Sequence, residues 1–166
     1  MRAIDHDHKG HHRGIPFDSV VLAHDERVLR RKLLTTAGGN EILVDLPSST
    51  PFETGDVLVL EDGRTVEVIA GAEPLYAITA KDSQHLAQLI WHIGNRHLPC
   101  QIEMETGRIL IGRDHVIKDM LEGLGASVVD VVEPFSPVRG AYGGHSHDHG
   151  HGHHHHHGDH HTHSHG

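Results

Sequence analysis

The chain has 166 residues, and its formal net charge is −9 when histidine is counted as neutral. With 23 acidic residues against 14 basic ones and no basic stripe, it lacks the positive surface that phosphate binding needs, which argues against a nucleic-acid partner. A single cysteine, Cys100, excludes a disulfide within the chain. The start is polar, and no apolar run approaches the roughly 20 residues that span a bilayer, so we expect a soluble cytoplasmic protein without membrane segments.

The first part of the chain, residues 1–72, is predicted to be a disordered arm followed by a small all-β domain. Residues 1–14 are polar and form the arm, with histidines at His6, His8, His11 and His12. Residues 15–72 contain four strand-like apolar runs, at 28–35, 41–46, 56–60 and 65–70. The last two runs flank Asp62-Gly63, and Asp-Gly between two such runs predicts a tight hairpin turn.

Residues 73–135 mix helical and strand patterns. A first amphipathic helix is indicated by four apolar residues at i, i+3, i+4 and i+7, which are Leu86, Leu89, Ile90 and Ile93. Asp82 or Ser83 can cap its start, and Gly94-Asn95 can end it in the left-handed conformation.

A second helix is predicted at residues 114–125, with Asp114 as its N-cap. Strand-like segments precede and follow the helices, at residues 75–80, 98–106, 107–112 and 126–135. The resulting order is β-α-β-β-α-β, which is the ferredoxin-like arrangement. The predicted fold class is therefore α+β, with the all-β domain at 15–72 followed by a ferredoxin-like domain at 73–135.

Residues 136–166 read as a flexible linker and a histidine-rich tail that cannot build a core. Thirteen of the 22 histidines lie in residues 145–166. Imidazoles at alternate positions can capture Ni²⁺, Cu²⁺, Zn²⁺ or Co²⁺, and the affinity order of these ions does not reveal which one is intended. The expected tail ligands include His145, His147, His149, His151 and His153. A purification tag is the alternative, but Gly, Asp and Ser interrupt the histidines.

Two histidines outside the tail are candidate metal ligands. His97 follows the first helix and precedes Pro99; it either binds a metal or closes the helix end by bonding a carbonyl. His115 shares the solvent face of the second helix with Asp119 and Glu122, at i, i+4 and i+7. That face either binds a metal or is an ordinary solvated surface.

Other reactive residues have simpler interpretations. His85 and His92 are expected to be half-buried histidines bonded to the backbone, and Cys100 is a small buried residue or an auxiliary metal ligand. The chain contains no phosphate-binding loop, no His-Glu-x-x-His and no Cys-x-x-Cys. With no positioned nucleophile or base either, we expect no enzymatic activity.

Two segments in this order resemble the UreE family of urease accessory proteins: "HIGNRH" (92–97) at the end of the first helix and "RDHVIKDMLEGLGA" (113–126) in the second. The resemblance runs from about Ile15 to Pro134, includes "LEDGRTVEV" (60–68), and is followed by a histidine-rich C-terminus. It implies a homodimeric nickel metallochaperone that works with the urease accessory GTPase and the urease apoprotein complex. The all-β domain at 15–72 resembles a peptide-binding module, and the resemblance implies that it contacts partner proteins.

The resemblance also assigns roles to single residues. It implies that His97 from both subunits binds nickel at the two-fold axis and that His115 lies at a secondary metal site. Some family members carry another histidine two residues before this second position, where this chain has Arg113. A second ligand at that site is therefore in question.

The leading hypothesis is delivery of Ni²⁺ for urease maturation by ligand exchange, with Zn²⁺ or Cu²⁺ able to occupy the same sites. The alternative is a nickel or zinc store or buffer that acts through its tail. A third hypothesis is a metal-dependent enzyme, but the predicted histidine site has no general base beside it, which argues against this hypothesis. Deletion of residues 145–166 separates the first two, because a buffer loses its function and a chaperone keeps delivery through His97.

Overall fold

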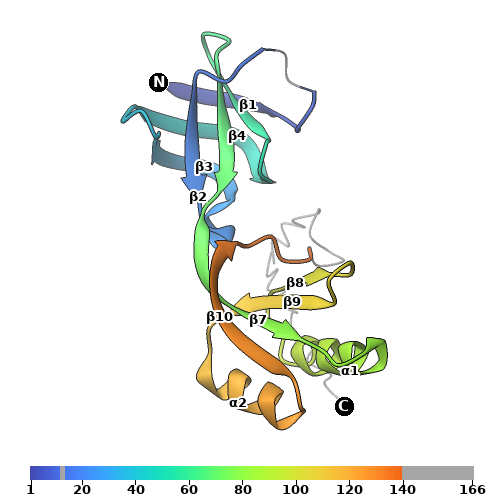
Figure 1. Ribbon diagram of the computed structural model, residues 1–166. Coiled ribbons are helices and arrows are strands. Elements are labelled where there is room, and N and C mark those ends of the chain that lie inside the picture. Colours follow the sequence, from blue (N-terminus) through green and yellow to red (C-terminus); the bar gives the residue numbers. More distant parts are fainter. Residues whose placement is uncertain (12–13, 140–166) are drawn as a thin grey trace, which may run out of the picture.

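The computed structural model describes residues 1–11 and 14–139, and these form two β-sheets and two α-helices. Figure 1 shows two lobes, the first built around the N-terminal sheet and the second around the C-terminal sheet with both helices. Strand β7 (Ala72–Thr79) runs from the junction into the second lobe. The predicted α+β class is confirmed. Within the described ranges, no helix is long and apolar enough to cross a bilayer.

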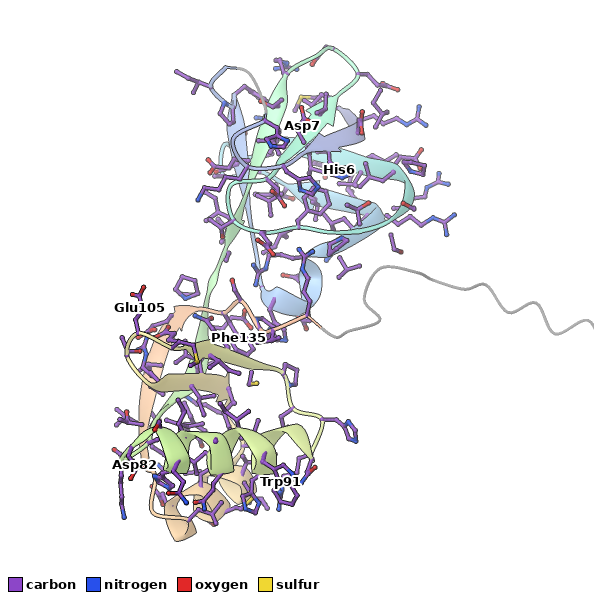
Figure 2. The ribbon with its side chains drawn as sticks, turned by 90° about the vertical axis from the view of Figure 1, so that its right-hand side faces the viewer. His6, Asp7, Asp82, Trp91, Glu105 and Phe135 are labelled. Carbon is purple, nitrogen blue, oxygen red and sulfur yellow. The ribbon has the colours of Figure 1, made fainter. Side chains whose placement is uncertain are left out.

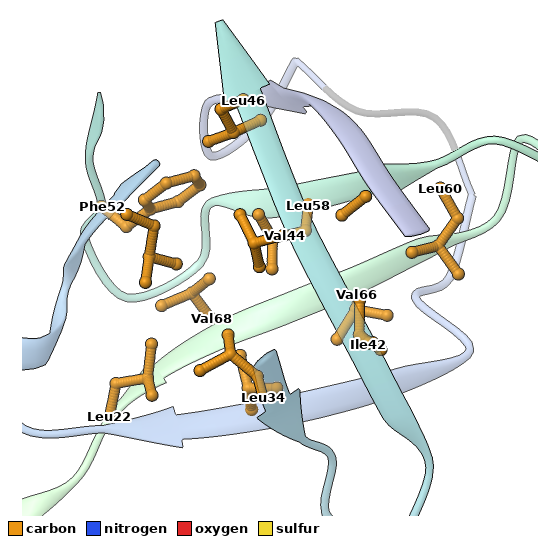
Figure 3. Close-up of a cluster of buried hydrophobic side chains, with 13 residues drawn as sticks. Leu22, Leu34, Ile42, Val44, Leu46, Phe52, Leu58, Leu60, Val66 and Val68 are labelled. Carbon is orange, nitrogen blue, oxygen red and sulfur yellow. The ribbon is translucent and has the colours of Figure 1, made fainter. Parts of the chain in front are cut away.

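The N-terminal sheet has six strands in the order β2-β6-β5-β1-β4-β3. They are β1 (Arg2–Asp7), β2 (Asp18–Leu22), β3 (Val28–Thr35), β4 (Glu41–Pro51), β5 (Val57–Leu60) and β6 (Thr65–Ala70), with a short 3-10 helix at His24–Glu26. Because alternate residues of a strand point to the same side, the buried ones meet in a single apolar cluster (Figure 3). The predicted hairpin is confirmed: β5 and β6 are antiparallel, and Gly63 has a φ of 81°.

The predicted disordered arm is wrong for residues 2–7, which form β1 between β4 and β5 in the interior of the sheet. Ala3 is completely buried, while the rest of the strand is polar or partly exposed. Arg2 pairs with Asp45 at 2.7 Å and with Glu61 at 2.9 Å. A strand with one fully buried side chain carries almost no hydrophobic pattern, so composition alone suggested disorder. Residues 12–13 of the predicted arm lie outside the described residues.

The C-terminal sheet has four strands in the order β10-β7-β9-β8, and all neighbours are antiparallel. After β7 the elements are α1 (Ser83–Gly94), β8 (Cys100–Glu103), β9 (Arg108–Gly112), α2 (His115–Gly123) and β10 (Ser127–Pro134). This is the predicted element order β-α-β-β-α-β. Both helices pack on one face of the sheet through an apolar stripe that includes Leu86, Leu89, Ile93, Ile117 and Leu121. The opposite face holds a smaller buried cluster of Leu75, Ala77, Leu110 and Phe135.

Aspartate caps fix the starts of both helices, as predicted. The side chain of Asp82 accepts a hydrogen bond from the His85 backbone at 2.8 Å. Asp114 accepts from the Val116 and Ile117 backbones at 2.9 and 3.1 Å. The predicted end of α1 is wrong in its backbone geometry, because Asn95 is right-handed, with a φ of −62°. The left-handed residue is His97.

Candidate metal site

His97 lies just after α1 in a backbone conformation that side chains rarely adopt. Its φ is 56°, and it is the one non-glycine residue with a positive φ in the described ranges. Its backbone N–H donates to the Gly94 carbonyl at 3.0 Å and so extends the last turn of the helix. A β-carbon in the left-handed region costs roughly 1 kcal/mol, and strain of this kind concentrates at functional positions. The backbone thus distinguishes His97 from an ordinary loop residue.

The imidazole of His97 is exposed, and its ring makes no hydrogen bond to another described residue. The helix end is therefore closed by the backbone N–H of His97 and not by its ring. A neutral imidazole has one nitrogen with a lone pair that can bind a metal. In this conformation the ring is held at the surface with that nitrogen available.

A cavity of about 310 Å³ lies beside this loop. Its lining comes from both lobes: His24, Leu98, Pro99, Ile111, Gly112, Arg113, Asp114 and Phe135. Leu98 adjoins His97 and Asp114 adjoins His115, so the loops that carry the two candidate ligands border the same cavity. The loop before β8 and the loop before α2 are separate in the sequence, but they lie beside the same cavity in the structure.

His115 is the first residue of α2, and its side chain is exposed, as are those of Asp119 and Glu122. Arg113 is engaged elsewhere: its guanidinium donates to the carbonyls of Leu75 at 3.2 Å and Val131 at 3.0 Å. Arg113 therefore connects β7 and β10, and it provides no metal ligand beside His115. The exposure of His115, Asp119 and Glu122 is compatible with either interpretation, a solvated face or a surface metal site.

No group of three or more histidine, cysteine or carboxylate side chains is close enough to hold a metal ion among residues 1–11 and 14–139. The described part of one chain thus offers single imidazoles and no complete coordination shell. A site at His97 needs further ligands from a second copy of the chain, from the tail or from a partner protein.

Three further candidates of the second lobe are His85, His92 and Cys100. Nδ1 of His85 accepts from the Lys81 backbone at 3.0 Å, and Nε2 lies 2.8 Å from the Leu124 carbonyl, so the predicted backbone bonding of His85 is confirmed. The ring of His92 is half-buried and meets the edge of Trp91 at a centroid distance of 5.0 Å. Burial raises the pKa of the Cys100 thiol, which favours its protonated form.

The sequence patterns did not identify an apolar surface on α1. Trp91 is 64% exposed and borders a shallow hollow of about 520 Å³. The other residues that line it are Gln84, Ala87, Gln88, His92 and Leu124, and together with Trp91 they form what we call the Trp91 surface. Figure 2 shows Trp91 on the outer side of α1. The available signal in the sequence was a lone tryptophan outside the buried helical stripe.

The tail histidines His145, His147, His149, His151 and His153 lie outside the described residues. The structure does describe the segment that leads to them. The backbone N–H of Ser136 donates to the Gln101 side chain at 2.8 Å, and that of Val138 donates to the Cys100 carbonyl at 2.8 Å. The predicted flexible linker is therefore wrong for residues 136–138, which are bonded to β8 three residues beyond His97.

Residues 2–71 match the family described as the N-terminal domain of the UreE urease accessory protein, and residues 73–165 match the family described as its C-terminal domain. The chain belongs to the UreE family. It is 57% identical over 135 residues to the urease accessory protein UreE of Brucella anthropi, covering 81% of this chain and 78% of that one. It is 58% identical over 145 residues to UreE of Agrobacterium fabrum, covering 83% and 89% of the two chains. UreE 1 of Brucella suis is 58% identical over 132 residues, with 79% and 80% covered.

Membership of the UreE family gives the chain a role in urease maturation as an accessory protein rather than as the enzyme. The two family matches meet between residues 71 and 73, where β6 has ended and β7 begins. The C-terminal match includes both His97 and His115 and continues into the tail.

Proposed function

We propose that this chain is a nickel metallochaperone that delivers Ni²⁺ to the urease maturation complex by ligand exchange. The observation that carries the proposal is the exposed imidazole of His97, held in a left-handed backbone at the end of α1. Imidazole suits Ni²⁺ and equally Zn²⁺ and Cu²⁺, which can occupy the same sites. A site with few protein ligands binds its cargo reversibly, which a delivery protein requires.

The chain acts as a homodimer in this proposal, because one imidazole is a poor chelate and two copies related by a two-fold axis supply a pair. The Trp91 surface supports this arrangement. It lies on the same helix that leads into His97, and its exposed aromatic and aliphatic groups suit self-association. Pairing α1 of two copies brings the two helix ends, and with them the two His97 rings, towards a common axis.

The second lobe is proposed to be ferredoxin-like, which its strand order β10-β7-β9-β8 supports. Tail histidines from His145 onwards capture Ni²⁺ and pass it to His97, and His115 forms a weak secondary site. The urease accessory GTPase, in complex with the urease apoprotein, receives the ion. The N-terminal lobe contacts these partners, and the process takes place in the cytoplasm.

A nickel or zinc buffer is the second candidate. The abundance of histidines in residues 145–166 favours it, since 13 imidazoles bind several ions without any role for the folded lobes. The two functions differ in which residues are indispensable: His97 for delivery, the tail for storage.

The test is activation of urease apoprotein by purified accessory proteins, together with nickel titration of each variant. His97→Ala should abolish one tight site per dimer and abolish activation, while most ions remain bound. Truncation after Gly144 should remove most ions and impair activation chiefly when nickel is scarce. His115→Ala should cost a weak site and little activation. Loss of activation on truncation in ample nickel, with normal activation by His97→Ala, would mean that the tail itself is the chaperone and that our assignment of His97 is wrong.

A further inference from the structure

Residues 135–139, which we call the crossing segment, carry the chain across one end of the C-terminal sheet. The segment leaves β10, at one edge of the sheet, and reaches β8, at the other edge. Three strand spacings separate these edges, which amounts to about 14 Å. Without the crossing segment, the chain beyond residue 134 would depart from the sheet at its β10 edge. With the crossing segment, the chain departs from the sheet beside β8, the strand that follows the His97 loop.

The sheet itself holds the crossing segment at three points. Phe135 is 1% exposed and packs against Leu75, Ala77 and Leu110, on the face away from the helices. The Ser136 N–H bonds the Gln101 side chain, and the Val138 N–H bonds the Cys100 carbonyl. An apolar anchor followed by two directional hydrogen bonds fixes both the position and the heading of the chain.

The N-terminal lobe holds the same segment from the other side, and Figure 2 shows Phe135 near the junction between the lobes. The guanidinium of Arg27 donates to the Phe135 carbonyl, and the ring of His24 meets the Phe135 ring edge-on at a centroid distance of 4.9 Å. Arg139 pairs with Glu53 at 3.0 Å. Phe135 and Arg139, at the two ends of the crossing segment, thus both contact the first lobe.

Arg27 is the most informative of these residues. It is 5% exposed, and its buried Nε has no hydrogen-bond partner among the described residues. Burying a guanidinium costs free energy that an apolar side chain of similar size would not. Its bond to the Phe135 carbonyl is therefore the feature that explains an arginine at this position.

We propose that Arg27 is a positioning residue through which the N-terminal lobe fixes the start of the histidine-rich tail beside His97. This inference rests on the proposed function of His97 and the tail. The Val138 N–H bonds the carbonyl of Cys100, which is three residues from His97. Three residues of chain span at most about 10 Å, so the backbone of Val138 lies within that distance, plus the length of one hydrogen bond, of the His97 backbone. His145 is seven residues beyond Val138, a stretch of chain that spans at most about 24 Å. Release of the crossing segment moves this starting point towards the far edge of the sheet.

Two pairs of variants of the full-length chain test the proposal. Val138→Pro removes the N–H that bonds Cys100, whereas Val138→Ala keeps it; Val138 is 63% exposed, so neither change disturbs the core. Arg27→Met removes the donor to Phe135, and Arg27→Lys retains a cationic donor. Thermal unfolding of each variant confirms that the comparison is between folded proteins.

The first measurement is amide hydrogen exchange by NMR on the metal-free protein. The Ser136 amide should exchange about tenfold faster in Val138→Pro and Arg27→Met than in their controls, because the segment opens more often. Unchanged exchange in Arg27→Met would overturn the role of the N-terminal lobe in holding this segment. This measurement involves no nickel, so it stands whether or not the proposed function is correct.

The second measurement is the nickel affinity of the site that His97→Ala removes. We expect it to weaken about tenfold in Val138→Pro and Arg27→Met, because the tail imidazoles lose effective concentration at His97. The same substitutions should have no effect in a chain truncated after Gly144, which a general structural defect would not predict. Faster exchange with unchanged affinity would refute the positioning role. Absence of any His97-dependent nickel site in the unaltered chain would refute the proposed function and this role with it.

Discussion

The carboxylate of Glu73 faces His24 with both oxygens: one accepts the His24 backbone N–H at 2.8 Å, and the other lies 2.8 Å from the ring Nδ1. His24 belongs to the 3-10 helix of the first lobe and Glu73 to β7, so this pair joins the two lobes. The side chain of Glu73 is only 16% exposed.

Substitution of Glu73 by alanine should lower the free energy of unfolding by about 1–2 kcal/mol, because the His24 N–H loses its acceptor in a partly buried place. Urea denaturation followed by circular dichroism measures the change. Glu73→Gln should lose less, since its amide oxygen can still accept one hydrogen bond. Equal stability of Glu73→Ala and the unaltered chain would show that water replaces the carboxylate without loss.

His97→Gly should raise the free energy of unfolding by about 1 kcal/mol, because glycine adopts a positive φ without the penalty of a β-carbon. His97→Ala keeps that β-carbon and should bring no such gain. Both variants should lose the tight nickel site. The comparison requires urea denaturation for stability and calorimetry for nickel. A less stable glycine variant would mean that the left-handed backbone is not strained.

Trp91→Glu should convert the proposed homodimer into a monomer, because it places a charge in the centre of the Trp91 surface. Light scattering should give about twice 18.3 kDa for the unaltered chain and 18.3 kDa for the variant. Val129→Glu, on the exposed side of β10, is a matched control that should leave the dimer intact. A dimeric Trp91→Glu protein would place the interface elsewhere.

Asp18 should make the first lobe sensitive to acid. Hydrogen bonds from the side chains of Thr36 and Asn40 lower the pKa of Asp18 to about 2, below the value near 3.9 of an unfolded chain. Its stabilising effect is therefore present above the unfolded-chain pKa near 3.9 and is lost progressively as the pH falls through the folded-state pKa of about 2. Asp18→Asn should lower the urea midpoint at pH 7, and this difference should shrink as the pH falls towards 2. A difference that persists unchanged at pH 2 would contradict this assignment.

Most of the second lobe could be predicted because its helices carry strong local signals. The apolar stripe of Leu86, Leu89 and Ile93 fixed α1, and the aspartates at 82 and 114 marked both helix starts. The first lobe was predicted less well because β1 is stabilised by pairing with β4 and β5, which no local pattern reveals. Strand pairing depends on segments that are distant in the sequence, whereas helix periodicity can be recognised within one short segment.

The candidate site shows the same division. His97 was identified by its motif, but the left-handed residue was expected two to three residues earlier, at Gly94-Asn95, because glycine and asparagine are the residues that most often end a helix in that conformation. The contact of Arg27 with Phe135 joins residues 108 positions apart. In the sequence Arg27 is simply an arginine beside a predicted strand, and nothing there indicates that it is buried. Such a contact depends on how the two lobes meet, which the sequence pattern does not specify.

The placement of β1 has a consequence for how the chain is made. Residues 2–7 leave the ribosome before their hydrogen-bonding partners, which are β4, at 41–51, and β5, at 57–60. Strand β1 must therefore wait until synthesis has passed about residue 60 before both of its edges can be covered, and until then the first lobe cannot close. A nick or deletion within residues 2–7 would remove an interior strand: it would open a gap between β4 and β5 and divide the sheet in two.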